Sequence, residues 1–380
     1  MIYLDYAATT PMSDRAIEVY TKVARSYFAN SQSLHDEGTS AAKLLEIARQ
    51  TIATEINGDP SGVYFTSGGT ESNVLTINGL VRKHKSGHLI TGKAEHSSII
   101  NTFQQLEREG FDVTYLGYDD KGQIQIDELM KEIRDDTILV SIAHGNSEIG
   151  TLQPVEAIGS ELSRRGILFH TDAVQTFGKV QIDVKNLNLT ALSVSSHKLH
   201  GPKGVGACYI DPSESWQATL PGTVHEKGFR PGTVDVPGIF AFTAAVEEAA
   251  TNVDANHAHC NELREGLLNE LSGRDVVIEG GRCGLAHIVA IRLKGIEGQY
   301  VMNELNQKGI AVSTGSACSI GQQSPSKTLK AMGRTDDEAR ELVRISFGKH
   351  TTKEEIVKTS EVMKGILSRF TGTTRILSNE

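Results

Sequence analysis

The sequence has 380 residues, of which 38% are hydrophobic and 22% are charged. This is ordinary for a soluble globular protein and allows one large domain plus a smaller one. The 38 basic and 47 acidic residues give a net charge of -9, which argues against a broad nucleic-acid-binding surface. No apolar run is long enough to span a bilayer, and the N-terminus lacks the basic region and apolar core of a secretion signal.

The four cysteines are scattered along the chain without metal-ligand spacing: Cys208, Cys260, Cys283 and Cys318. Such use fits a reducing compartment, so we expect a cytoplasmic protein without a metal site and without a membrane or nucleic-acid partner. Cys208 lies in a predicted strand and is expected to be a small buried hydrophobic residue.

The N-terminal region predicts two helices and a possible phosphate site. An extended lead-in (residues 3–11) precedes a helix from Ser13, its cap, to Ser26, and a longer helix runs from 37 to 57. A strand over 62–66 then leads into Ser67-Gly68-Gly69-Thr70-Glu71-Ser72-Asn73 at the start of a helix. Glycines and hydroxyl residues at a helix N-terminus can bind phosphate through backbone N–H groups and the helix dipole. An ordinary helix cap is the simpler alternative.

Strands and helices then alternate up to about residue 210. Strands are predicted over 88–92, 112–116, 137–143, 166–170, 191–195 and 205–210, with a helix starting near His96. Apolar strands in such alternation predict an α/β fold with a parallel sheet and helices on both faces. Ligand-binding groups should therefore lie at the carboxyl ends of the strands, where the sequence has Thr70, His96, Ser147, Asp172 and Lys198.

Two of these residues suggest a specific chemistry. Lys198 lies between two apolar strands, beside hydroxyls, a histidine and a Gly-Pro turn. A lysine desolvated at the end of a buried strand has a lowered pKa and can form a Schiff base with an aldehyde cofactor, pyridoxal 5'-phosphate (PLP) above all. Asp172 ends another buried strand, where a carboxylate can pair with a pyridinium nitrogen. Taken singly, the lysine could be a surface residue in a polar turn and the aspartate a turn or helix cap.

The C-terminal third predicts a second, smaller α+β domain. A long helical stretch from Pro237 to about Leu271 should cross between the domains, and shorter strands are predicted over 286–293, 310–313 and 342–346. We expect a large domain over residues 12–255 and a small domain made of residues 1–11 and 256–380.

Several motifs occur in a specific order along the whole chain: Tyr3-Leu4-Asp5-Tyr6-Ala7-Ala8-Thr9-Thr10-Pro11, Phe65-Thr66-Ser67-Gly68-Gly69-Thr70-Glu71-Ser72, Glu95-His96, Asp172-Ala173-Val174-Gln175, His197-Lys198, Phe229-Arg230-Pro231-Gly232-Thr233, Ser313-Thr314-Gly315-Ser316-Ala317-Cys318 and Arg344-Ile345-Ser346. With them the chain resembles the NifS/IscS-type cysteine desulfurases, PLP enzymes of the class V aminotransferase group. The resemblance implies the PLP-dependent transferase fold of aspartate aminotransferase type (fold type I).

The resemblance also implies roles for individual residues. Lys198 would carry PLP as a Schiff base and move the substrate's α-proton, while Asp172 would keep the pyridinium protonated. His96 would stack on the ring as an acid–base group. Further cofactor contacts are implied for Gln175 and Ser147 at the phenolic oxygen, and for Gly69, Thr70, Ser195 and His197 at the phosphate. Thr233 would reach the phosphate from the partner subunit, which implies a homodimer with shared active sites. Arg344, aided by Asn30, would clamp the substrate carboxylate, because a guanidinium fork fits a carboxylate.

Cys318 is the nucleophile in this interpretation. It would take the sulfur of L-cysteine as a persulfide, release L-alanine and pass the sulfur to an acceptor protein. The chain departs from the family pattern at Ser147, where an asparagine is usual, at Ser31, where a proline is usual, and over 221–226, where glycines are usual. These differences, with an end soon after Thr374, suggest a specialised member with one acceptor, for tRNA thiolation or iron–sulfur cluster assembly. A selenocysteine lyase, an aminotransferase and a degenerate PLP-fold scaffold are the alternatives.

Overall fold

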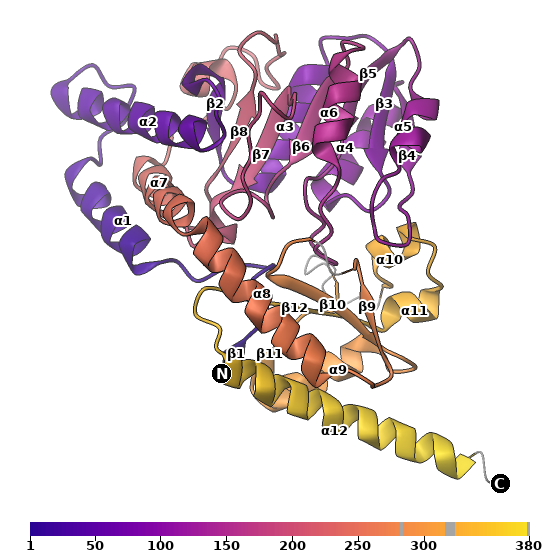
Figure 1. The fold of residues 1–380 in the computed structure, drawn as a ribbon. Helices are drawn as coiled ribbons and strands as arrows, with labels where there is room; N and C mark the ends of the chain where they lie inside the picture. The colour runs from indigo at the N-terminus through magenta and orange to yellow at the C-terminus, as the bar shows by residue number, and fades with distance from the viewer. Residues whose placement is uncertain (282–283, 316–323, 378–380) are drawn as a thin grey trace.

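The computed structural model describes residues 1–281, 284–315 and 324–377. Figure 1 shows a large sheet with its helices above and a smaller sheet below, joined by a long helical connection that crosses the molecule diagonally. Within the described residues, no helix is both long enough and apolar enough to cross a membrane.

The large sheet is mostly parallel, as predicted. Its spatial order is β2 (Val63–Thr66), β8 (Gly206–Ile210), β7 (Ala191–Ser195), β6 (Leu168–Asp172), β5 (Thr137–Ser141), β3 (His88–Gly92) and β4 (Asp112–Leu116). Only β8 runs antiparallel to its neighbours β2 and β7. The turn between β7 and β8 contains no crossover helix, and a parallel pairing of consecutive strands would need one. This turn is the segment that carries Lys198.

Alternating side chains of the strands build two cores, one on each face of this sheet. Leu89, Leu139 and Ala191 face a core with α3 (Gly69–Val81) and α4 (Ser97–Arg108). Their chain neighbours Ile90, Val140 and Leu192 face the opposite core. That second core is covered by the following helices: α2 (Asp36–Glu55), α5 (Ile126–Glu132), α6 (Val155–Ser163) and α7 (Val236–Thr251). The period of two in each strand therefore places helices on both faces.

The first helix begins as predicted. In α1 (Asp14–Ser26) the Ser13 side chain accepts a hydrogen bond from the Ala16 N–H at 3.2 Å. Helix α1 packs on α7.

The smaller body has its own core, which is shared by the N-terminal segment and the C-terminal third. Its antiparallel sheet has the order β12 (Leu342–Ser346), β10 (Ile288–Leu293), β9 (Val276–Glu279), and β1 (Ile2–Tyr3) pairs parallel with β11 (Ile310–Ala311). The helices are α8 (Val253–Glu270), α9 (Gly298–Gln307), α10 (Lys327–Ala331), α11 (Asp336–Arg340) and α12 (Lys353–Leu377). The sequence analysis missed β9, and the domain boundary near residue 255 stays a prediction.

The helical stretch after Pro237 consists of two helices, because α7 ends at Thr251 and α8 starts at Val253. Asn252 between them has φ -120° and ψ 13°, outside helical geometry. Its side-chain amide donates to the Glu248 carbonyl oxygen at 2.7 Å. An asparagine that bonds its own backbone in this way competes with helix continuation, which accounts for the break.

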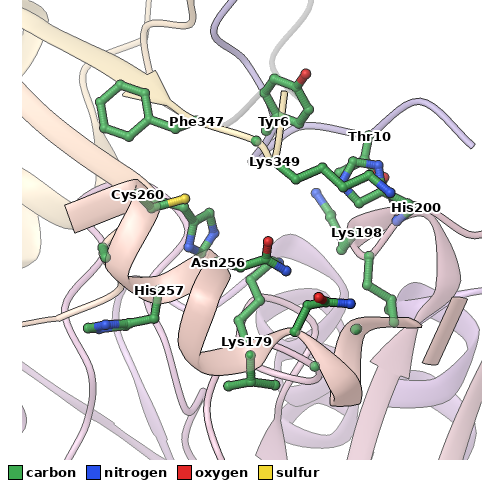
Figure 2. Close-up of a pocket in the computed structure, with 18 of the residues that line it drawn as sticks. Tyr6, Thr10, Lys179, Lys198, His200, Asn256, His257, Cys260, Phe347 and Lys349 are labelled. Carbon is green, nitrogen blue, oxygen red and sulfur yellow. Dashed lines mark hydrogen bonds between the residues drawn. The ribbon is translucent and has the colours of Figure 1, made fainter. Parts of the chain in front are cut away.

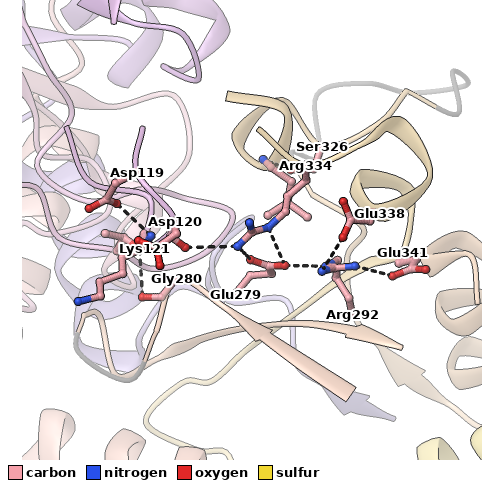
Figure 3. A network of polar contacts seen from close by, with 12 residues as sticks. Asp119, Asp120, Lys121, Glu279, Gly280, Arg292, Ser326, Arg334, Glu338 and Glu341 are labelled. Atoms are coloured by element: carbon pink, nitrogen blue, oxygen red, sulfur yellow. Dashed lines mark hydrogen bonds and ion pairs between the residues drawn. The ribbon is translucent and has the colours of Figure 1, made fainter. Parts of the chain in front are cut away.

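A polar network links the small sheet to the large body (Figure 3). The buried Glu279 carboxylate at the end of β9 accepts from Arg292 Nε at 2.6 Å and from Arg334 Nη2 at 3.2 Å. Arg334 also donates to the Asp120 carbonyl oxygen at 3.4 Å, in the loop after β4. Arg334 therefore connects the two bodies at the loop that follows the edge strand β4.

Candidate active site

A cavity of about 520 Å³ opens at the carboxyl ends of the large-sheet strands. We call it the coenzyme cavity. Ten of the residues singled out from the sequence line it: Gly69, Thr70, His96, Ser147, Asp172, Gln175, Ser195, His197, Lys198 and Arg344. Most of them meet because parallel strands β3, β5, β6 and β7 all end at the same edge of the sheet, whereas Arg344 comes from β12 of the smaller sheet.

Lys198 ends a short 3-10 helix (Ser196–Lys198) directly after β7. Its ammonium donates to the carbonyl oxygens of Ala7 at 2.6 Å and Ala8 at 2.8 Å. The same N-terminal segment is fixed to the Lys198 turn by Thr10, whose hydroxyl donates to the His197 carbonyl oxygen at 2.9 Å. The N-terminal segment after β1 therefore forms the wall against which the amine lies.

Asp172 belongs to a hydrogen-bonded chain of side chains. The Asn73 amide nitrogen on α3 donates to Asp172 Oδ2 at 2.7 Å and to Ser98 Oγ at 3.0 Å. Ser98 Oγ lies 2.8 Å from His96 Nδ1. This chain, Asp172–Asn73–Ser98–His96, connects the carboxylate expected at the pyridine nitrogen with the histidine expected to stack on the ring.

The same contacts define the protonation of His96. The Ser98 backbone N–H donates to His96 Nδ1 at 3.2 Å, and a backbone N–H can only donate. Burial lowers the pKa of His96, although the Asp172 carboxylate opposes this shift. His96 is therefore a neutral imidazole whose proton is on Nε2.

The segment from β2 into α3 forms an anion cradle together with β7. Gly68 has φ 146°, and a Cβ on Gly69 would lie 2.7 Å from Val174 Cγ2, so a side chain would collide there. The Ser195 hydroxyl, at the end of β7, is buried and has no hydrogen-bond partner among the described residues. His197 bonds Thr9 Oγ1 at 3.0 Å, and burial together with the Lys198 charge lowers its pKa to about 4. This geometry suits a phosphate, which the free backbone N–H groups at the start of α3 can bind.

Arg344 is 2% exposed and lies at the small-domain side of the coenzyme cavity. Its guanidinium donates to Asp5 Oδ1 at 2.8 Å and to the Ser147 carbonyl oxygen at 2.9 Å. Arg344 Nε has no partner among the described residues. The guanidinium is thus held in place by two contacts and keeps donor capacity for a further acceptor.

Two further residues of this site, Asn73 and Glu95, occur in the motifs quoted above but were assigned no role from the sequence. Asn73 lies one helical turn after Thr70, a spacing that could have indicated it. Glu95 lies on the cavity wall and accepts from the Ala143 N–H at 3.1 Å and from the Tyr118 hydroxyl at 3.3 Å. Burial raises the pKa of Glu95 to about 8, so this side chain is mostly protonated at neutral pH.

Two predicted residues of the described chain, Asn30 and Thr233, are not among those that line the coenzyme cavity. Asn30 is exposed in the loop between α1 and α2, where its side chain accepts from the Gln32 N–H at 3.0 Å. Thr233 is exposed in the segment before α7. Cys318 lies outside the described residues. In the described part of the chain, no group of three or more His, Cys, Asp or Glu side chains could hold a metal ion.

Comparisons with known proteins identify the family. The family model described as aminotransferase class-V matches residues 2–358, and the chain belongs to this family. It is 48% identical over 366 residues to a putative cysteine desulfurase NifS of Bacillus subtilis, covering 94% of this chain and 92% of that one. Among solved structures it is similar to a NifS-like protein, with TM-score 0.90 and 32% identity over 97% of this chain and 99% of that one. It also resembles a structure described as SspA in complex with cysteine, with TM-score 0.83 and 35% identity over 93% of this chain and 100% of that one. The resemblance and the expected fold are confirmed.

The cofactor of this family is PLP, and the coenzyme cavity fits it. Besides the anion cradle, the cavity contains a carboxylate for the pyridine nitrogen, a lysine for the aldehyde and a histidine at the cavity wall. The buried Gln175 Oε1 has no partner among the described residues, while Gln175 Nε2 is held by the Ala7 carbonyl oxygen at 3.0 Å. Oriented buried polar atoms without partners mark places where a bound group would complete the hydrogen bonding.

Proposed function

We propose that this protein is a PLP-dependent cysteine desulfurase. The observation that carries the proposal is that Lys198, Asp172 and His96 meet in one cavity with an anion cradle and Arg344. Relatives named as cysteine desulfurases match nearly the whole chain. Bound PLP supplies the electron sink that makes bonds to the amino-acid carbons labile.

In the proposed reaction, L-cysteine and the Cys318 thiol give L-alanine and a Cys318 persulfide. A sulfur–sulfur bond forms as the carbon–sulfur bond of L-cysteine breaks, and the carbon gains the proton that the Cys318 thiol loses. Atoms and electrons balance without an external oxidant or reductant.

The chain's own side chains orient the substrate and move protons. Arg344 binds the substrate carboxylate through the donors left beside Asp5 and Ser147. Lys198 would take the α-proton with its amine, and neutral His96 would offer the proton on Nε2. Asp172, fixed by Asn73, would hold the ring nitrogen of PLP through its carboxylate.

The experiment is incubation of the PLP-loaded protein with L-cysteine, followed by measurement of alanine and by mass spectrometry of Cys318. The wild type should form alanine and add one sulfur atom to Cys318. Cys318→Ala should lose sulfur transfer, whereas Cys260→Ala, which alters a buried cysteine on α8, should keep it. An aminotransferase would be insensitive to Cys318→Ala, and a scaffold would form no alanine.

We also infer a homodimer with shared active sites. The loop that carries Asn30 and the segment that carries Thr233 border one groove, which Gln32 and Val224 line. Large apolar side chains are exposed on the same segments: Phe28 (75% exposed), Leu34 (100%) and Val224 (67%). Exposed apolar residues gathered around polar ones are typical of a protein–protein interface.

Mixing two inactive variants tests this sharing. Lys198→Ala and Thr233→Ala chains should each be poorly active alone. If Thr233 serves the partner's site, mixed dimers contain one intact site, and roughly a quarter of the wild-type activity should return after random exchange of subunits. No recovery with demonstrated exchange would refute the sharing of sites.

The sulfur acceptor is proposed to be one dedicated protein, such as a tRNA thiolation enzyme, in the cytoplasm. Ser147 and the 221–226 segment depart from the family pattern, which supports a specialised member of the family. The buried free Cys208 and Cys260 fit a reducing compartment. Labelled persulfide should move to a thiolation enzyme in preference to an iron–sulfur scaffold protein. The reverse preference would contradict this assignment.

A further inference from the structure

A second cavity lies beside Lys198, between the two bodies of the molecule (Figure 2). Its volume is about 230 Å³, and we call it the hinge cavity. The large domain contributes Lys179 and Leu199, the helices α7 and α8 contribute Ala245 and Asn256, and the small domain contributes His287 and Lys349. Because all three parts form its wall, a molecule that fills the cavity contacts both bodies at once.

The charges around the hinge cavity are unequal. Three lysines line it, Lys179, Lys198 and Lys349, and the one carboxylate among the lining residues is Glu248. Figure 2 shows Lys198, Lys349 and His200 at one side of the cavity and Cys260 at the other. Lys349 and Glu248 form an ion pair with each other. PLP would occupy Lys198 in the loaded protein, which leaves Lys179 as the lysine in this wall without a carboxylate partner among the described residues.

Lys179 has spare hydrogen-bonding capacity. Its ammonium donates to the Gln175 carbonyl oxygen at 3.2 Å. Among the described residues, no carboxylate forms an ion pair with it. An ammonium has three N–H donors, so two remain for an acceptor in the cavity. Burial, reinforced by the Lys198 charge, lowers the pKa of Lys179 to about 7, and an amine without a carboxylate partner among the described residues favours a negatively charged ligand.

A second polar group in the cavity wall also lacks a partner. His287 is 7% exposed, and its Nε2 makes no hydrogen bond to any described residue. Burial lowers the pKa of His287 well below its ordinary value, so the ring is neutral and can form a hydrogen bond without adding charge. The rest of the wall is largely apolar, with Val180, Ala245 and Phe347 among the lining residues.

We propose that the hinge cavity binds a small aliphatic carboxylate, whose anionic end contacts Lys179 and whose carbon chain packs on the apolar wall. At about 30 Å³ for each water-sized group, the cavity holds a molecule of about seven non-hydrogen atoms. A four-carbon carboxylate fits this limit. A ligand that contacts both bodies of the molecule stabilises their present arrangement when it binds.

The test measures butyrate binding to the PLP-loaded protein by calorimetry near pH 6, where most of Lys179 carries its charge. Butyramide, a neutral molecule of the same shape, is the ligand control. Arg344→Gln is the control for the active site, because it removes the other group that can hold a carboxylate. We expect Arg344→Gln to bind one butyrate per chain with the affinity of the wild-type hinge cavity, and butyramide to bind more weakly than butyrate. Lys179→Gln should weaken butyrate binding by about tenfold or more, the loss of a charge-assisted hydrogen bond.

Three results would overturn the proposal. Butyrate could bind to Lys179→Gln but not to Arg344→Gln, which would place it at the substrate clamp. Butyramide could bind as well as butyrate, which would exclude recognition of charge. Butyrate could fail to bind at all.

A second variant covers the case in which Lys179→Gln does not take up PLP. Asn256→Trp narrows the cavity from α8, at a half-buried position, without changing any lysine. It should also lose butyrate binding, and unchanged binding in this variant would count against the hinge cavity.

Discussion

The two cavities that meet at Lys198 differ in how their polar groups are supplied. The coenzyme cavity is lined by residues that follow strand ends, and its groups are held by hydrogen bonds from neighbouring side chains, as Asn73 holds Asp172. The hinge cavity draws its amines from three separate parts of the chain, and Lys179 has a single carbonyl partner.

This difference separates fixed groups from adaptable ones. A reaction needs groups held to within a fraction of an ångström, and a supporting network of hydrogen bonds provides that. A site between two domains changes shape when the domains move, so it suits a ligand that senses their arrangement more than a reaction.

The largest effect is expected where a charged pair fastens the segment that carries Thr233. Glu226 is 4% exposed, with φ 46°, and its carboxylate accepts from Arg49 Nη2 at 2.6 Å and from the Phe65 N–H at 2.7 Å. Glu226→Ala removes the buried carboxylate partner of the Arg49 guanidinium. This change should lower the free energy of unfolding by about 3 kcal/mol in urea titrations. The control is Glu247→Ala, which removes an exposed ion pair to Arg15 and should cost less than about 1 kcal/mol. Equal losses would mean that this pair does not anchor the segment.

Removing the carboxylate of the coenzyme cavity should mainly affect turnover. Asp172→Ala weakens the protonation of the ring nitrogen and should reduce alanine formation on the order of tenfold or more. Absorbance of the lysine-bound cofactor shows whether PLP is still present. Normal turnover with bound PLP would show that the fixed carboxylate is not needed for the electron sink.

Glu95 predicts a pH dependence of stability. Its pKa is about 8 in the folded protein, above the ordinary value of 4.5, because of burial. Between pH 4.5 and pH 8 the folded state binds the Glu95 proton more tightly than the unfolded state does. The resulting contribution to the free energy of unfolding is fully present below about pH 4.5 and is lost as the pH rises through about 8. Glu95→Gln stays neutral, and its stability relative to wild type should grow with pH by at most about 1.4 kcal/mol per unit over that window. Thermal or urea unfolding from pH 5 to 9 measures this, with the exposed Glu107→Gln as control. A constant difference across the series would contradict the buried, protonated carboxyl group.

The coenzyme cavity could largely be predicted because its residues occur in short contiguous motifs at the ends of apolar strands. Strands β3, β4, β7 and β12 have the predicted bounds, since each is a compact apolar run. A parallel sheet then brings residues such as Thr70, Asp172 and Lys198 together without further information.

The remaining features depend on contacts between distant parts of the chain. Arg344 forms an ion pair with Asp5, which lies near the other end of the sequence, and no local sequence pattern predicts such a pair. The hinge cavity has no motif either, because Lys179, Asn256 and Lys349 read separately as ordinary helix and loop residues. The break at Asn252 was missed because helical periodicity continues on both sides of it.

The smallest expected effect tests the side-chain network of the coenzyme cavity. Asn73→Leu keeps the approximate volume on α3 but removes the amide that donates to Asp172 and Ser98. The Asp172 carboxylate then loses one of its donors but keeps the Val174 N–H at 2.9 Å, so its position loosens while its charge remains. We expect turnover to fall about threefold to tenfold, the cost of one ordinary hydrogen bond, because the Val174 N–H still holds the carboxylate, and we expect little change in KM.

A merely structural role for Asn73 would give a different result. The pH titration of the cofactor absorbance should shift in Asn73→Leu, because the ring nitrogen's partner is less well held. Asn78→Leu on the same helix is the matched control, since the Asn78 amide donates to the Val74 carbonyl oxygen of its own helix, away from the cavity. If both variants lower stability and leave the absorbance titration unchanged, Asn73 only supports α3, and the coenzyme cavity would owe its fixed geometry to the backbone alone.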